Sequence, residues 1–234
     1  MDFAKKRAEK GDKVLYPTYN KNLANNINRQ LDSKENLKVI NIHALFGEYV
    51  NVNVDRMKEN PTKYFGEILP EEFYQWINGL PEDEAKDLKY DLLVMDEGQD
   101  IIKPIYLYSL DALLNGGLEK GDWAIFYDEK QNIYNPEYQD GMEIISSYMA
   151  TKFKLFVNCR NTVQIGTYSA KASGVEIHDF LQENGEEVQT VSYSGMDDFK
   201  KQIKDIIKKI RAEKVDTKDI AFLAPKKYSN SILG

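Results

Sequence analysis

The chain is poor in the residues that build metal–thiolate sites, disulfides and membrane spans. It holds one cysteine, Cys159, and two histidines in 234 residues. These can form neither an internal disulfide nor a four-ligand zinc site, and such sparse cysteine suits a reducing, cytoplasmic compartment. No apolar run approaches the roughly 18–20 residues of a transmembrane helix. The charged first residues do not resemble a signal peptide, so we expect no membrane partner.

An excess of positive charge is also missing. Thirty-one Lys and Arg residues stand against 38 Asp and Glu residues, which gives a formal net charge of -7. Proteins that bind nucleic acid mainly through charge are usually basic. Any nucleic-acid contact must therefore use local patches or parts that this chain does not contain. The hydrophobic content of 42% suffices for one large domain or two small ones.

Apolar runs alternate along the chain with segments of helical periodicity. The expected strands are Lys13–Tyr19, Leu37–Ile42, Tyr90–Met95, Trp123–Tyr127, Phe153–Asn158, Glu186–Tyr193 and Asp219–Pro225. The expected helices are Asn20–Leu31, Pro104–Leu114, Thr162–Ser173 and Asp197–Glu213, after a short helix that ends near Gly11. This alternation predicts an α/β fold with a mostly parallel sheet covered by helices on both faces.

Residues 47–88 interrupt this alternation. Pro61, Pro70 and Pro81 punctuate short helical pieces there, including Pro70–Leu80 with proline in its first turn. We expect a small helical insertion. The predicted organisation is a first domain over 1–152 that contains this insertion, followed by a partial second domain over 153–234.

The stretch YDLLVMDEGQD combines an expected buried strand with an acidic end at Asp96 and Glu97. In parallel sheets, ligands bind outside the carboxyl ends of the strands. Magnesium takes one or two protein carboxylates together with phosphates and water. A second carboxylate beside the ion can orient an attacking water. The stretch thus has the pattern of a Walker B motif, although a strand that runs into a solvated acidic loop would look the same.

Four other segments follow expected strands in the same way. FYDEKQNIY places Asp128 and Gln131 at a strand end, and NCRNT places Arg160 at another. Arginine is suited to the charge that develops on a transferring phosphoryl group. YPTYNKNLA and NIHALF bring small polar and aromatic residues, which contact phosphates and stack on bases.

In their order along the chain, these five segments resemble the motifs of superfamily 1 DNA helicases of the UvrD-like type. PTYNKNLA resembles motif Ia, and NIHALF resembles the Thr-x-His motif with Asn41 in place of Thr. VMDEGQD resembles motif II, and FYDEKQNIY resembles motif III with Tyr127 in place of Gly. NCRNT resembles motif IV with Cys159 in place of Tyr. The resemblance implies RecA-like domains that use ATP and magnesium to move on single-stranded DNA.

The resemblance also implies a role for each matching residue. Asp96 would coordinate magnesium, Glu97 would activate the attacking water, and Gln131 would report the γ-phosphate. Arg160 would approach that phosphate from the second RecA-like domain. The residues that would complete the nucleotide site or link it to the DNA site are Gln99, Asp100 and Asp128. The residues that would lie along the single-stranded DNA are Thr18, Asn20, His43 and Tyr134.

A P-loop, Gly-x-x-x-x-Gly-Lys-Thr/Ser, is absent from the sequence. Such a loop supplies the backbone N–H groups and the lysine that hold the phosphates. The family's motifs V and VI would follow Gly234. We therefore expect an internal piece of a longer helicase, in which ATP and magnesium belong to the parent protein and this chain alone binds neither. Two alternatives are a non-catalytic scaffold of helicase shape and a metal-dependent nuclease that uses Asp96, Glu97 and Asp100.

Overall fold

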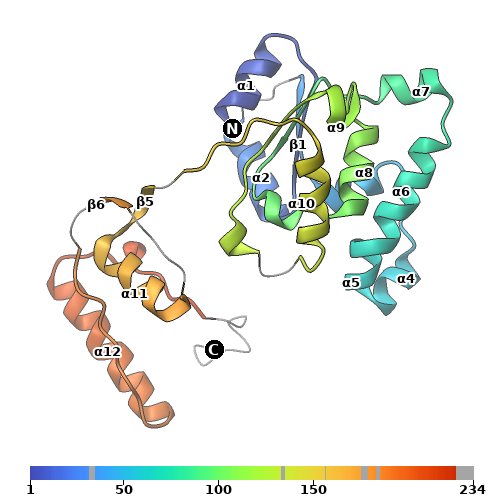
Figure 1. Ribbon diagram of the computed structural model, residues 1–234. Helices are drawn as coiled ribbons and strands as arrows, with labels where there is room; N and C mark the ends of the chain where they lie inside the picture. The colour runs from blue at the N-terminus through green and yellow to red at the C-terminus, as the bar shows by residue number, and fades with distance from the viewer. Residues whose placement is uncertain (32–34, 133–134, 156, 175–178, 183–184, 225–234) are drawn as a thin grey trace. The chain divides into compact units, whose positions relative to one another are not determined.

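The computed structural model describes the whole chain except residues 32–34, 133–134, 156, 175–178, 183–184 and 225–234. Two compact units are present, Met1–Lys154 and a second that starts at Leu155 (Figure 1). No described helix has both the length and the apolar character needed to cross a membrane.

Four parallel strands form the sheet of the first unit, in the order β2-β1-β3-β4. Their bounds are β1 Val14–Thr18, β2 Leu37–Asn41, β3 Leu92–Met95 and β4 Asp122–Ile125. Each overlaps a strand expected from the sequence, so the predicted α/β fold with a parallel sheet is confirmed. Because all four strands run the same way, the segments that follow them emerge at one edge of the sheet.

Helices cover both faces of this sheet. Val14 and Tyr16 of β1 pack with Val94 of β3 in one buried cluster, together with alanines of α1 (Asp2–Glu9) and α2 (Lys21–Gln30). Leu15 and Met95 belong to the opposite cluster. The helices that supply side chains to this second cluster are α3 Ile42–Gly47, α6 Leu69–Asn78, α8 Pro104–Ala112, α9 Gly117–Lys120 and α10 Tyr138–Ser147. Successive side chains of a strand point to opposite faces of the sheet, and helices cover both faces, so the unit has three layers.

The expected helical insertion lies between β2 and β3 and includes a π-helical turn, η1 (Tyr64–Ile68). Its other helices are α4 Val54–Glu59, α5 Pro61–Lys63, α6 Leu69–Asn78 and α7 Glu82–Asp87. The Leu69 N–H bonds to the Tyr64 carbonyl, five residues back. Pro70 has no N–H, so it cannot continue this pattern to the Phe65 carbonyl. Proline therefore leaves the Phe65 carbonyl without a donor from its own helix.

The second unit differs from the expected pattern at its strands. It contains β5 Val157–Thr162, β6 Asp179–Gln182, α11 Val163–Ser173, α12 Met196–Ala212 and the single turn η4 Thr217–Asp219. The expected strand Phe153–Asn158 begins only at Val157, because Phe153 and Leu155 are 89% and 93% exposed and pair with nothing described.

Two further strand predictions are wrong, and the strand β6 was not predicted. Glu186–Tyr193 and the described part of Asp219–Pro225 contain no strand, while Pro225 itself lies outside the described residues. Residues of high strand propensity form a strand only where another strand pairs with them, and β5 pairs with β6 instead. The two predicted helices of this unit are confirmed as α11 and α12.

Candidate functional site

Glu97, the predicted water-activating residue, has an uncommon backbone conformation. It lies directly after β3 with φ 51° and ψ 43°, in the left-handed region. A non-glycine residue there costs on the order of 1–3 kcal/mol and persists only where its surroundings hold it. The Gln99 side-chain amide donates a hydrogen bond to the Glu97 carboxylate at 2.6 Å. A hydrogen bond between two residues of DEGQD therefore holds the turn after β3 in this conformation.

Gly98 lets this turn approach β4 closely. Its N–H donates to the Phe126 carbonyl at 2.8 Å. A Cβ at this position would lie 2.6 Å from the Ile125 methyl group, which is closer than real contacts allow. Only glycine fits at this position of DEGQD without a clash. The close approach places Glu97 beside the segment that follows β4.

Gln99 joins the two acidic segments. Its side chain is almost fully buried, and its Oε1 accepts from the Asp128 N–H at 3.1 Å while its amide donates to Glu97. Asp128 in turn accepts from the Gln131 side-chain amide at 2.8 Å. Four predicted site residues, Glu97, Gln99, Asp128 and Gln131, therefore lie in one chain of hydrogen bonds.

Asp96 is oriented by a residue that the sequence analysis did not identify. The buried Tyr16 hydroxyl donates to Asp96 Oδ2 at 2.9 Å, and the Glu97 N–H donates to Oδ1 at 3.1 Å. Burial, followed by the charge of Asp96, raises the pKa of Tyr16, so the phenol remains a donor at neutral pH. Its position in an apolar strand gave no signal, since a buried strand tyrosine is ordinary packing.

The Asp96 carboxylate fits a magnesium ion in chemical type. Each of its oxygens keeps acceptor capacity beyond the single hydrogen bond that it receives. Magnesium is bound through one or two carboxylates together with phosphates and water. Among the described residues, no three His, Cys, Asp or Glu side chains gather as a metal-ligand set. A cavity of about 150 Å³ lies beside Tyr16 and Asp96, below the roughly 300 Å³ at which ligand pockets start.

The turns after β1 and β2 are tied together by Asn41. Its side chain caps α3 through the Ala44 N–H and donates to the Tyr19 carbonyl at 2.6 Å. Asn20 caps α2 in the same way. Thr18 is fully buried, and its hydroxyl donates to the Asn20 carbonyl at 3.1 Å. Thr18 therefore shapes this turn, whereas Asn20 and Tyr19 are exposed on it.

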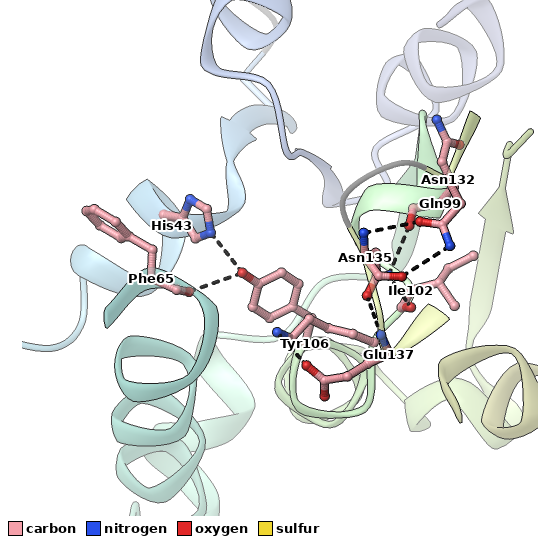
Figure 2. A network of polar contacts seen from close by, with 9 residues as sticks. His43, Phe65, Gln99, Ile102, Tyr106, Asn132, Asn135 and Glu137 are labelled. Carbon is pink, nitrogen blue, oxygen red and sulfur yellow. Dashed lines mark hydrogen bonds and ion pairs between the residues drawn. The ribbon is translucent and has the colours of Figure 1, made fainter. Parts of the chain in front are cut away.

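His43 lies among aromatic rings at the start of α3. Its ring centroid is 5.2 Å from that of Tyr19 and 5.1 Å from that of Phe65. Burial, and then the charge of Lys103, lowers the pKa of His43 to about 4. The imidazole is therefore neutral at pH 7. Its Nε2 lies 2.8 Å from the Tyr106 hydroxyl (Figure 2).

Asn135 links the segment after β4 to the residues just before α8, and no sequence pattern indicated this role. Its side-chain amide donates to the carbonyls of Gln99 at 3.0 Å and Ile102 at 2.7 Å, as Figure 2 shows. Its own carbonyl accepts from the Asn132 amide at 3.1 Å. Asn135 thereby holds the Gln99 backbone in place, while Asp128 bonds to the Gln99 side chain.

Three other predicted residues lie outside this hydrogen-bonded chain. Asp100 is partly buried, and burial and then Glu97 raise its pKa. Arg160 belongs to the second unit, on β5, where its side chain is exposed. Its approach to a phosphate stays a prediction. Tyr134 lies outside the described residues.

Comparison with protein-family models gave no match, and comparison with curated proteins gave none either.

Proposed function

We propose that this chain is part of an ATP-dependent, superfamily 1-like helicase or translocase that moves on single-stranded DNA. The observation that carries the proposal is the hydrogen-bonded chain from Glu97 through Gln99 and Asp128 to Gln131. It links two motif-like segments that are about thirty residues apart at the carboxyl edge of a parallel sheet, where such folds bind ligands.

In this proposal each side chain acts from the position given above. Asp96, oriented by Tyr16, would hold the magnesium ion that neutralises phosphate charge. Glu97 would orient the attacking water and accept its proton. Gln99 would transmit a shift at Asp128 or Gln131 to Glu97, because its amide bonds to both segments. Asn20, Tyr19 and His43 would face the single strand. The RecA-like assignment and the cytoplasmic location belong to the same proposal.

The chain alone is proposed to lack ATP hydrolysis. Its sequence contains no P-loop, and positioning and charge stabilisation supply most of the catalysis in phosphoryl transfer. This observation also favours the second candidate, a non-catalytic binding or scaffold protein of helicase shape. The two candidates differ in one property. In the helicase, the Glu97 site hydrolyses ATP once a P-loop is supplied, whereas in the scaffold it never hydrolyses ATP.

The test is a DNA-stimulated ATPase assay on the purified chain and on any longer reading frame that adds a P-loop. We expect no turnover by this chain, and single-strand-dependent turnover by the longer protein that Glu97→Gln abolishes. A longer protein with a P-loop but without turnover would favour the scaffold. Turnover by this chain itself, lost in Glu97→Gln, would contradict the proposed dependence on the missing loop.

A further inference from the structure

A chain of hydrogen bonds connects the helical insertion to His43. The Phe65 carbonyl is left without a helical donor because the residue that would supply it is Pro70. The Tyr106 hydroxyl, on the first turns of α8, donates to this carbonyl at 3.1 Å. The same hydroxyl lies 2.8 Å from His43 Nε2. Figure 2 shows a dashed line from the Tyr106 hydroxyl to each of the other two groups.

The direction of this chain determines the tautomer of the imidazole. A phenol has one hydrogen, and the Tyr106 hydroxyl gives it to the Phe65 carbonyl. Tyr106 can therefore only accept from His43, so Nε2 carries the hydrogen and Nδ1 is an acceptor. Among the described residues, none donates a hydrogen bond to Nδ1. Pro70, which lies outside the NIHALF segment, thus orients His43 indirectly, through the Phe65 carbonyl and the Tyr106 hydroxyl.

The surroundings keep the imidazole in this neutral form. The titratable and charged groups that face it are Tyr19 after β1, and Lys103 and Tyr106 on and before α8. Lys103 is itself held by Glu137, with Nζ 3.0 Å from Oε1 and 5.0 Å from the centre of the Tyr106 ring. The positive charge of Lys103 opposes a second positive charge on His43.

We propose that Tyr106 is a positioning residue that fixes His43 with its hydrogen on Nε2, so that Nδ1 accepts a hydrogen bond from single-stranded nucleic acid. The inference rests on the proposed function only for the identity of the ligand. A neutral imidazole does not attract phosphate by charge, and phosphate oxygens offer no hydrogen. The group that Nδ1 recognises is a donor, carried either by a base edge or by a ribose 2′-hydroxyl.

The tautomer is measured first, by ¹⁵N NMR of the imidazoles in the full chain. The second histidine, His178, is assigned with a His178→Gln variant. We expect the hydrogen of His43 on Nε2 in the wild type. Tyr106→Phe removes the acceptor and should move population to the Nδ1–H form, whereas Tyr108→Phe, at an exposed position of the same helix, should not.

Pro70→Ala tests the role of the insertion. An alanine N–H at position 70 can donate to the Phe65 carbonyl and compete with the Tyr106 hydroxyl. The released hydroxyl can then donate to Nε2, so the Nδ1–H population should rise. Pro81→Ala, at the start of α7 in the same insertion, is the matched control. His43 with its hydrogen on Nδ1 in the wild type would overturn the proposal, and so would a tautomer that is unchanged in Tyr106→Phe.

Binding is measured at low salt with three probes: oligo(dT), oligo(rU) and an abasic deoxyribose oligomer. Tyr106→Phe should weaken binding roughly three- to tenfold, the effect of one hydrogen bond, on every probe that carries the recognised donor. Loss on both oligo(dT) and oligo(rU) assigns the donor to the base, and loss on oligo(rU) alone assigns it to the 2′-hydroxyl. Equal loss on the abasic oligomer would overturn the recognition role.

The tautomer and binding results together distinguish a failure of this inference from a failure of the proposed function. If the tautomer and its dependence on Tyr106 are found but no probe binds, the single-strand function fails and the recognition role falls with it. If the probes bind and Tyr106→Phe changes neither tautomer nor affinity, the proposed function stands and the positioning role of Tyr106 is overturned.

Discussion

At the scale of the residue, His43 couples the protonation of one side chain to the stability of the first unit. Its pKa is lowered from 6.5 to about 4 by burial and by Lys103. The folded state therefore disfavours the imidazolium that the unfolded chain accepts below pH 6.5. The stabilising effect of the neutral imidazole is complete above that pH and is lost as the pH falls towards 4.

This gives a prediction for unfolding as a function of pH. Between pH 6.5 and 4 the free energy of unfolding should fall by about 3 kcal/mol through His43, since one pKa unit corresponds to about 1.4 kcal/mol. Urea unfolding at pH 7, 5.5 and 4 measures it. His43→Gln, which keeps a donor for Tyr106 but does not titrate, is the control. Wild type and variant with parallel pH profiles would contradict the prediction.

Residues differ in how well the sequence alone assigns them to the site. Asp96, Glu97 and Asp128 were predicted because they directly follow apolar strands and because their segments occur in the order of the helicase motifs; the acidic strand end alone would also fit a solvated loop. Tyr16, Tyr106 and Asn135 were not, because each acts through a partner that is remote in sequence: 80 residues away for Tyr16 and Asp96, and 63 for His43 and Tyr106. Such pairs are defined only by the fold.

At the scale of the element, the sequence predicted a helix or strand correctly where the fold buries the apolar face of that segment. β1, β3 and α8 were predicted within about two residues, because each has a continuous or periodic apolar face that the first unit buries. Glu186–Tyr193 also contains β-branched and aromatic residues, but it is not a strand. Local pattern therefore indicates which face is apolar, and the partner strand decides whether a strand forms.

The junction of two elements, η2 (Gly98–Asp100) and β4, gives a second prediction. Gly98→Ala should cost roughly 1–3 kcal/mol, because the added methyl group overlaps Ile125 and must displace one of the two segments. The midpoint of urea unfolding measures the loss. Gly66→Ala is the control, since its Cβ would meet only the end of the Lys103 side chain, at 3.8 Å. Equal midpoints for both variants would show that the junction has more room than its packing indicates.

At the scale of the whole molecule, the two units bury very different amounts of their side chains. The first has two buried clusters, one on each face of its sheet. In the described part of the second, Gly166 is the one buried residue of its helices and strands, and Leu181 and Leu223 are 67% and 95% exposed. Apolar burial is the main source of folding free energy, so the stability of the two units should differ.

Hydrogen exchange tests this difference. Amides of β1 and β3 should exchange through global opening of the first unit, many orders of magnitude more slowly than amides of β5 and β6, which should open locally. Both tryptophans, Trp76 and Trp123, belong to the first unit, so their fluorescence follows its unfolding alone. We expect β5 and β6 amides to exchange fully under conditions where this fluorescence is still native. Protection of β5 that disappears together with the tryptophan signal would instead make the two units one cooperative structure.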